Sequence, residues 1–409
     1  MIGLDRLIVV VIAGLLLGGC GNTFNRGSSA APPTDVIAVP GDGSVTVTWT
    51  MAPNVQYWLF YAPTNVITEA NWTTIPGSNA IIGATSPAVI SGLSNGTTYA
   101  FMINGRVNGG PGGADSPSIS AVPRLAGVSW QAGGPLCGGT CILNGETHGG
   151  VFVAVGNGGY MFSSPDGVGW TPLANPTAPL NLSAAAQSAG NYVVVGVTGI
   201  ILFSSDAVNW AQKAINSTND LAAVASNGSG VYVAVGKGGT IVFSSDGQNW
   251  IAPPNPIVSP VTTDLYGVAY GNGLWVAVGS GGAILTSPDA INWATVTSNT
   301  AADLKAVTIG VNANTGTNLF VAVGAAGTIV TSPDAVTWSV PPQVNVNLNA
   351  VTYGRQFVAV GDVGAVLTST DGANWQSQTS GTSANLNAVA PNGTGYSAVG
   401  ADGVDLSAY

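Results

Sequence analysis

Carboxylates are the residues of this chain that could do chemistry. Outside a repeated turn motif described below, the candidates in the C-terminal part are Glu146, Asp220, Asp264, Asp303 and Asp362. Two carboxyl groups about 5 to 10 Å apart can act as the acid and base of a glycoside hydrolase. Nothing in the sequence marks one of these residues as the acid and another as the base. Glycoside hydrolysis is therefore the alternative function, not the leading one.

Other reactive sets are poorly supported. His148 is the one histidine of the chain, and a Ser/His/Asp nucleophilic set is not supported by it alone. Residues 125–409 contain one arginine, Arg355, whereas a sialidase-like carboxylate clamp needs several. The glycine-rich runs are repeat turns and do not join a strand to a helix, so they do not indicate phosphate binding. We predict no catalytic residue, no cofactor and no metal.

The cysteines point to an exported protein. Cys137 and Cys141 are four residues apart, and an oxidising compartment favours a local disulfide between them. A structural zinc site is the alternative, but it needs four ligands and the chain has a single histidine.

The third cysteine, Cys20, ends an apolar segment that includes Leu7 to Leu17. This segment is short for a membrane span and is typical of a signal peptide. The run Leu17-Gly18-Gly19-Cys20 resembles the bacterial lipobox. The resemblance implies a signal peptide over residues 1–20 and lipidation of Cys20, with Gly21 favouring the outer membrane where the source has one. An ordinary signal peptide is the alternative.

Composition narrows the partners and the fold class. The chain has 8 basic and 18 acidic residues, a formal net charge of −10, which argues against nucleic acid and against a polybasic membrane patch. Charged residues make up 6% of the chain, where about 25% is usual. The 58 glycines and 24 prolines divide the chain into short segments, which favours an all-β fold.

The region before residue 125 divides into a tether and a domain. Residues 21–34 are small, polar and proline-containing, which is typical of a flexible tether. In residues 35–124, an alternating strand ends at Trp49, and the run Leu93-Ser94-Asn95-Gly96-Thr97-Thr98 precedes Tyr99. Trp49 and Tyr99 match the core tryptophan and the tyrosine corner of a β-sandwich, so this region resembles a fibronectin type III domain.

Residues 125–409 are a repeat array. Six copies of the pattern S-x-D-[GA]-x-x-W occur, with tryptophans about 40 residues apart, the length of one four-stranded propeller blade. The N-terminal piece ending at Trp130 has the tryptophan alone, and residues 396–409 have the strands that precede the motif. Together they predict a seventh blade, so that both ends of the domain close a seven-bladed β-propeller.

The repeated pattern resembles the Asp-box, or BNR repeat, and the array resembles the photosystem II assembly factor family. In Asp-box proteins the motif forms the turn between the two outer strands of a blade. An aspartate can accept backbone N–H groups across such a turn, and the serine adds a local bond. The following residues are therefore expected to be structural: Asp166, Asp206, Asp246, Asp289, Asp334 and Asp371.

A second repeated feature marks the opposite face. Asp or Asn precedes Leu at the start of six predicted innermost strands: Asn181, Asp220, Asp264, Asp303, Asn347 and Asn385. We expect Lys237 and Asp362 on the same rim. Two interpretations stay open: these residues cap turns, or they form a polar mouth that binds a ligand. The three aspartates follow one another around the ring and would form an acidic arc.

The sequence thus predicts an all-β protein, a fibronectin type III-like sandwich followed by a seven-bladed β-propeller. The leading function is a lipid-anchored binding or assembly scaffold of the cell envelope that holds an unidentified protein or glycan, with the sandwich as a spacer. The resemblance to the photosystem family supports binding, but a shared fold does not name the partner.

Overall fold

The computed structural model describes residues 27–215, 217–251 and 261–408. Cys20, the predicted signal peptide and the first residues of the predicted tether lie outside the described residues. Among the described residues, no helix is long and apolar enough to cross a membrane. The chain divides into two compact units, one containing a five-stranded sheet and the other a ring of sheets.

The N-terminal strands form two sheets. One contains, in pairing order, β1 (Ser28–Ala30), β7 (Tyr99–Val107), β4 (Gln56–Ala62) and β5 (Asn79–Ala84), with β8 (Ile119–Ala121) also paired to β7. The other contains β2 (Ile37–Gly41), β3 (Ser44–Thr48) and β6 (Ala88–Ser91). Leu59 and Ile103 face each other in register and are fully buried. Trp49 is buried and packs edge-on against Tyr57.

In the described residues, the rest of the chain forms seven antiparallel sheets, called blades 1 to 7. Blade 1 contains β10 (Leu143–His148), β11 (Phe152–Gly156), β12 (Met161–Ser164) and β13 (Thr171–Pro172), and blade 2 contains β14 (Leu182–Ser188), β15 (Asn191–Gly196), β16 (Ile201–Ser204) and β17 (Ala211–Lys213). Blade 3 contains β18 (Leu221–Ser226), β19 (Tyr232–Gly236), β20 (Ile241–Ser244) and β21 (Trp250–Ile251). Blade 4 contains β22 (Leu265–Gly271), β23 (Leu274–Gly279), β24 (Ile284–Ser287) and β25 (Ala294–Val296).

Blades 5 to 7 complete the set. Blade 5 contains β26 (Leu304–Val311), β27 (Asn318–Gly324) and β28 (Ile329–Ser332). Blade 6 contains β29 (Leu348–Tyr353), β30 (Phe357–Gly361), β31 (Val366–Ser369) and β32 (Gln376–Gln378). Blade 7 contains β33 (Leu386–Pro391), β34 (Tyr396–Gly400), β35 (Asp405–Ala408) and β9 (Trp130–Ala132). In blade 5, as far as the structure describes it, the place of a fourth strand is taken by a single bridge between Thr331 and Ser339 and by the Gln343 side chain, which bonds both backbone groups of Ile329.

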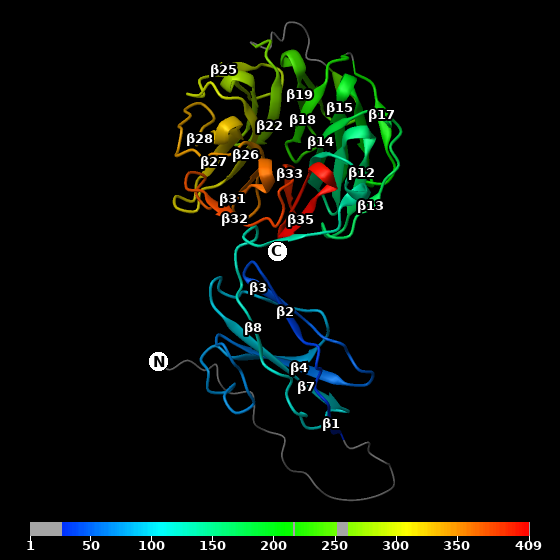
Figure 1. The fold of residues 1–409 in the computed structure, drawn as a ribbon, viewed down its shortest axis with the longest axis vertical. Coiled ribbons are helices and arrows are strands. Elements are labelled where there is room, and N and C mark those ends of the chain that lie inside the picture. Colours follow the sequence, from blue (N-terminus) through cyan, green and yellow to red (C-terminus); the bar gives the residue numbers. More distant parts are fainter. Residues whose placement is uncertain (1–26, 216, 252–260, 409) are drawn as a thin grey trace, which may run out of the picture. The chain divides into compact units, whose positions relative to one another are not determined.

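The seven first strands contact one another in a closed cycle, from β10 through β14, β18, β22, β26 and β29 to β33 and back to β10. Figure 1 shows the sheets arranged around a centre, with β35 among them. This all-β arrangement is consistent with a β-propeller. The core lies between neighbouring blades, because the second strand of each blade is buried along both faces, as in Tyr232–Gly236. Such strands form near-continuous apolar runs and do not alternate.

Blade 7 is built from two distant parts of the chain. β35 pairs with β9, so Ala408 lies opposite Trp130 and Leu406 lies opposite Ala132. Trp130 lies tilted against the ring of Tyr396 on β34 and donates its indole N–H to the Gly127 carbonyl oxygen. The pairing leaves the ring without an open joint between its first and last strands.

Two local features recur in every blade. A β-bulge follows the leucine that begins each first strand, as between Leu143 and Gly145. A 3₁₀ turn joins the second and third strands: η2 (Asn157–Gly159), η3 (Val197–Gly199), η4 (Lys237–Gly239), η5 (Ser280–Gly282), η6 (Ala325–Gly327), η7 (Asp362–Gly364) and η8 (Ala401–Gly403). An eighth turn, η1 (Leu136–Gly139), precedes β10. Both features lie at the same end of the blades.

Candidate functional site

The Asp-box turns lie at the other end of the blades. Each joins a third strand to the segment that follows, and its aspartate Oδ1 accepts the backbone N–H groups two and three residues ahead at 2.7–3.1 Å. The motif serine donates its hydroxyl to the same oxygen in all six copies. The carboxylate therefore satisfies donors that would otherwise point into a tight turn.

These bonds favour the ionised carboxylate. The backbone N–H and side-chain amide of Asn292 hold the pKa of Asp289 at about 2. The equivalent bonds from Asn209 lower the pKa of Asp206. A carboxylate with a lowered pKa stabilises the fold above its ordinary pKa and loses that contribution as the pH falls through the lowered value. The turns should therefore weaken only in strong acid.

The motif tryptophans pack across the joints between blades. Trp250 of blade 3, for example, belongs to a cluster with Val193 and Ala186 of blade 2. Trp338 of blade 5 likewise packs with Val276 and Val278 of blade 4. The other four motif tryptophans are partly buried and pack against the preceding blade in the same way.

The Asp and Asn residues of the opposite rim also join neighbouring blades. Asp220, at the start of blade 3, accepts the backbone N–H of Thr198 in η3 of blade 2 at 2.8 Å. At the same time, the Asp220 backbone oxygen accepts the N–H of Lys237 in its own blade. The side chain therefore caps the turn of one blade while the backbone caps the turn of the next.

The same side-chain bond occurs at six of the seven joints, with lengths of 2.7–2.9 Å. Its acceptors are Asn181, Asp220, Asp264, Asp303, Asn347 and Asn385. The donor is always the middle residue of the turn, which has positive φ even where it is Val363, at 56°. A β-branched residue is rarely found there, so this bond helps to hold a strained backbone. All six rim residues are turn caps in the structure.

The three rim aspartates are not equivalent. Asp303 Oδ1 accepts the Ser280 hydroxyl as well as the backbone N–H of Gly281, while Oδ2 lies 3.6 Å from the Lys305 ammonium. These backbone and side-chain contacts lower the pKa of Asp303. The acidic arc that the sequence predicts is therefore interrupted at blade 5 by a cation.

Lys305 also lies over an aromatic ring at the channel mouth. Its ammonium is 3.8 Å from the ring centroid of Tyr266 on the neighbouring blade 4. The side chain of Lys305 is 36% exposed, so the group is partly desolvated and still reachable from solvent. A cation held between an aromatic face and one carboxylate can bind an acidic or carbonyl-bearing ligand.

Lys305 and Tyr266 belong to a ring of residues that sequence reasoning missed. They occupy the bulge position after the leucine of each first strand, and all seven line a central cavity of about 170 Å³: Asn144, Ser183, Ala222, Tyr266, Lys305, Asn349 and Asn387. A bulge redirects one side chain out of the strand's alternation. The signal was available, because this position varies in type while the leucine before it is constant.

The asparagines of this ring are held by the blades themselves. Asn144 Nδ2 donates to Asn157 Oδ1 and to the Leu182 carbonyl oxygen. Asn349 Nδ2 donates to Asp362 Oδ1, which also places Asp362 at this mouth. Asn387 Nδ2 of blade 7 donates to the Leu143 carbonyl oxygen, so the cavity wall is preorganised at blades 1, 6 and 7, while Lys305 and Tyr266 belong to blades 5 and 4.

Glu146 does not point into solvent at this mouth. It is 9% exposed, and neither carboxylate oxygen has a protein hydrogen-bond partner in good geometry. Burial raises the pKa of Glu146 to about 8, the Ser397 hydroxyl opposes this, and the charge of Asp405 adds to it. The same position on the other blades is Val or Ala, as in Val224. Glu146 is thus a buried acid at a position that is apolar on the other blades.

The joint between blades 7 and 1 differs from the other six. Ile142 takes the place of the capping Asp or Asn, and the Gly403 N–H of η8 donates to the Cys141 carbonyl oxygen. Cys141 is bonded to Cys137 in the disulfide. The disulfide-closed loop thus substitutes for a side-chain cap at the joint where the chain closes its ring.

Comparisons with solved structures show a shared fold. Similar chains are YCF48 bound to a D1 peptide, at 18% identity with a TM-score of 0.53, and YCF48 from Cyanidioschyzon merolae, at 20% identity with a TM-score of 0.54. Both comparisons cover 68% of this chain, and 96% and 98% of those chains. A chain of the mitotic checkpoint complex matches at 11% identity and a TM-score of 0.52, over 69% of this chain and 94% of the other.

These identities establish the likeness in fold alone. No protein-family model matches the sequence, and no curated protein matches it.

Proposed function

We propose that the chain is an exported, lipid-anchored scaffold of the cell envelope that holds a partner protein at the channel mouth of its propeller. The observation that carries this proposal is the ring of bulge residues around the central cavity, with Lys305 and Tyr266 side by side within it. A preorganised polar wall with one partly exposed cation can select a peptide carboxylate or carbonyl group. A glycan is the second ligand class that such a mouth can hold.

The likeness to YCF48 supports a protein partner. One similar structure is that of YCF48 bound to a D1 peptide, so a propeller of this fold holds a peptide in that protein. We carry over the mode of action, a propeller that binds a segment of another protein, and not the identity of the segment.

We propose binding in preference to glycoside hydrolysis because the candidate carboxylates have other roles. Asp220, Asp264 and Asp303 each accept a backbone N–H of a neighbouring blade. The Glu146 oxygens are out of contact with solvent, so an attacking water would not reach them. An inverting or retaining mechanism needs both carboxyl groups at the sugar.

The N-terminal region is proposed to be a spacer. We interpret residues 35–124 as a fibronectin type III-like domain and residues 125–409 as the propeller. The two N-terminal sheets and the buried Trp49 support this interpretation. Such a domain would act as a spacer between the lipid anchor and the propeller.

The binding proposal is tested at the rim. The variant with Asp220, Asp264 and Asp303 all changed to Asn keeps the caps, because asparagine makes the same bond at the other three joints. Its melting temperature should stay close to that of the wild type. Affinity for a partner photo-crosslinked through Ala222 should rise by about tenfold at low salt, because three carboxylates that repel a peptide carboxylate at Lys305 are removed. This gain should shrink as salt is added.

The control for this test is Asp246→Ala. It should destabilise blade 3 by about 1–2 kcal/mol through lost turn bonds without altering partner binding. Unchanged affinity and salt dependence in the rim variant, together with no crosslinked partner at Ala222, would move the binding surface away from the channel mouth.

The anchor is tested separately. Cys20→Ala should release the protein from the membrane fraction or leave the signal peptide uncleaved, because the lipid-accepting thiol is gone. Detergent partitioning and the mass of the mature N-terminus measure the two results. A variant that partitions like the wild type contradicts lipid anchoring while leaving the propeller proposal intact.

A further inference from the structure

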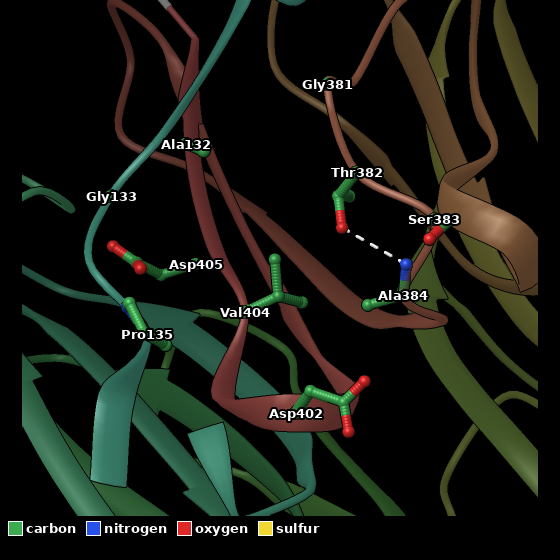
Figure 2. Close-up of a pocket in the computed structure, with 10 residues that line it drawn as sticks. All are labelled: Ala132, Gly133, Pro135, Gly381, Thr382, Ser383, Ala384, Asp402, Val404 and Asp405. Atoms are coloured by element: carbon green, nitrogen blue, oxygen red, sulfur yellow. Dashed lines mark hydrogen bonds between the residues drawn. The ribbon is translucent and has the colours of Figure 1, made fainter. Parts of the chain in front are cut away.

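A pocket of about 350 Å³ lies beside the strand pair that closes the ring. Figure 2 shows three segments around it: 132–135 after β9, 381–384 before β33, and 402–405 from η8 into β35. The Asp405 and Asp402 side chains lie on either side of Val404, and Asp405 points towards the segment from Gly133 to Pro135. The pocket is separate from the central cavity, which has a different set of lining residues.

Asp405 is an unusual lining residue because it is only 2% exposed. Its Oδ1 atom has no protein hydrogen-bond partner. Buried carboxylates are normally paired or multiply hydrogen-bonded, because an unsatisfied buried acceptor is costly. None of the ion pairs in the described part of the chain involves Asp405 or Asp402. Oδ1 is thus a buried acceptor at the pocket without a hydrogen-bond donor in place.

The backbone of Gly133 lies directly against the Asp405 carboxylate. Gly133 is so close to the carboxylate that a Cβ there would collide with both oxygens. A Cβ on the adjacent Gly134 would meet nothing within 4 Å. Any side chain at position 133 would therefore displace the carboxylate or fill the space in front of it, whereas position 134 tolerates one.

At neutral pH one negative charge lies at this joint. Burial raises the pKa of Asp405 to about 6, opposed by its own backbone N–H and the Trp170 indole. Its buried acidic neighbour is Glu146, whose pKa of about 8 leaves it protonated at pH 7. Asp402, which is exposed, adds charge near the opening. The protein's net charge of −10 favours the approach of cations.

We propose that this pocket binds a primary ammonium group, such as that of a lysine side chain presented by the partner. An ammonium supplies donors and a positive charge, the two things that Asp405 lacks. A hard divalent cation fits less well, because calcium takes six to eight oxygen ligands and no group of three His, Cys, Asp or Glu side chains occurs in the described residues. The exposed Ser383 can accept a further N–H.

This inference deepens the proposed function by naming the chemistry of a second contact with the partner. It does not need the partner for its test. The probe is the capped tripeptide acetyl-Ala-Lys-Ala-amide, titrated into the full chain by calorimetry or by NMR shifts. The neutral control is the same peptide with norleucine in place of lysine, and n-butylamine represents a free amine.

The lysine peptide should bind and the norleucine peptide should not. Asp405→Asn should weaken binding by more than about tenfold, since a bond to a charged partner is lost. Gly133→Ala should abolish binding, while the matched variant Gly134→Ala should keep it. Binding should strengthen about tenfold between pH 5 and pH 7, as Asp405 ionises while lysine stays charged. Equal binding of n-butylamine would assign the site to free amines.

Three results would overturn the proposal. They are equal binding of the norleucine peptide, undiminished binding by a folded Asp405→Asn variant, and displacement of the lysine peptide by micromolar calcium. Melting curves verify that each variant is folded. If the Asp405→Asn variant does not fold, Asp402→Asn at the exposed position is used instead and should reduce peptide affinity by a smaller factor. Failure of this site with an intact channel-mouth crosslink would reject the pocket and leave the proposed function standing.

Discussion

The free energy of unfolding is expected to fall as the pH rises from about 5 to about 8. The group responsible is Glu146, whose pKa is raised from 4.5 to about 8. In the unfolded chain the carboxyl ionises near its ordinary pKa, so between these values the folded state holds a proton that the unfolded state has released. Stability is therefore complete below pH 4.5 and decreases up to pH 8. The loss is on the order of 3 kcal/mol at pH 7 and 5 kcal/mol above pH 8.

The cause lies in the joint between blades 7 and 1. Glu146 on β10 faces Ser397 on β34 and the buried Asp405 on β35. Asp405, with a pKa of about 6, adds a loss of the same sign between its ordinary pKa and pH 6. His148 acts in the opposite direction: burial lowers its pKa, so its contribution increases as the pH rises towards 6.5. The Asp-box carboxylates fail only in stronger acid, so maximal stability is expected between about pH 4 and pH 5.

Glu146→Val tests this directly. Valine occupies the position on five of the six other blades, as in Val224 and Val268, so the variant should pack as its neighbours do. It should be more stable than the wild type at pH 8 by several kcal/mol, and should have lost most of the decrease with pH. Denaturant unfolding at pH 5, 7 and 8.5 measures both effects.

Two variants serve as controls. Glu146→Gln keeps the volume and removes the titration, so its stability should also vary little from pH 5 to 8. Glu69→Gln changes the only other glutamate of the chain, an exposed one, and should leave the pH profile unaltered. A wild-type chain whose stability is flat over this range would show that Glu146 is already ionised and paired in the folded state.

The regular spacing of the sequence repeats explains why the fold could be predicted. The 40-residue tryptophan spacing and the two incomplete ends predict blades and a shared last blade, and β9 indeed pairs with β35. The Asp-box roles also follow from sequence, because an aspartate and a serine two residues apart bond locally, whatever the surroundings. Local chemistry and strict repetition are the two properties that a single sequence reveals well.

The site was harder to predict because it depends on departures from the repeat. The repeated pattern of Asp or Asn before Leu indicates Asp220 and Asp264 as site candidates, but in the structure both cap turns. The residues that face the cavity, such as Lys305, stand one place after that leucine, where a bulge redirects them. The variable residue after the constant leucine is visible in the sequence, but only the bulged strand register shows that it faces the cavity.

The role of Glu146 likewise could not be predicted from the sequence alone. Aligning the repeats places it where other blades have valine, yet an acid at one apolar position has no meaning until its neighbours are known. Those neighbours, Ser397 and Asp405, are some 250 residues away in the chain and meet it only because the ring closes. No motif connects residues that distant.

Ring closure itself is expected to control whether the propeller folds. A chain that ends after residue 395 lacks β34 and β35, so β33 exposes an edge and β9 loses its partner. Val399 and Leu406 are fully buried and belong to the clusters that join blade 7 to blades 1 and 6. Losing them removes packing on both sides of the gap, and unpaired edges promote aggregation. We expect an insoluble product, or a chain without a cooperative melting transition.

A graded series separates strand closure from the loss of apolar mass. Leu406→Ala keeps the backbone pairing and should cost about 2–5 kcal/mol while unfolding stays cooperative. A synthetic peptide covering residues 396–409, added during refolding of the truncated chain, should restore solubility and the transition, because it supplies β34 and β35 in trans. The matched peptide with proline at positions 398 and 406 should fail, since proline cannot donate to the ladder. A truncated chain that melts like the full one would mean that six blades hold the ring without the seventh.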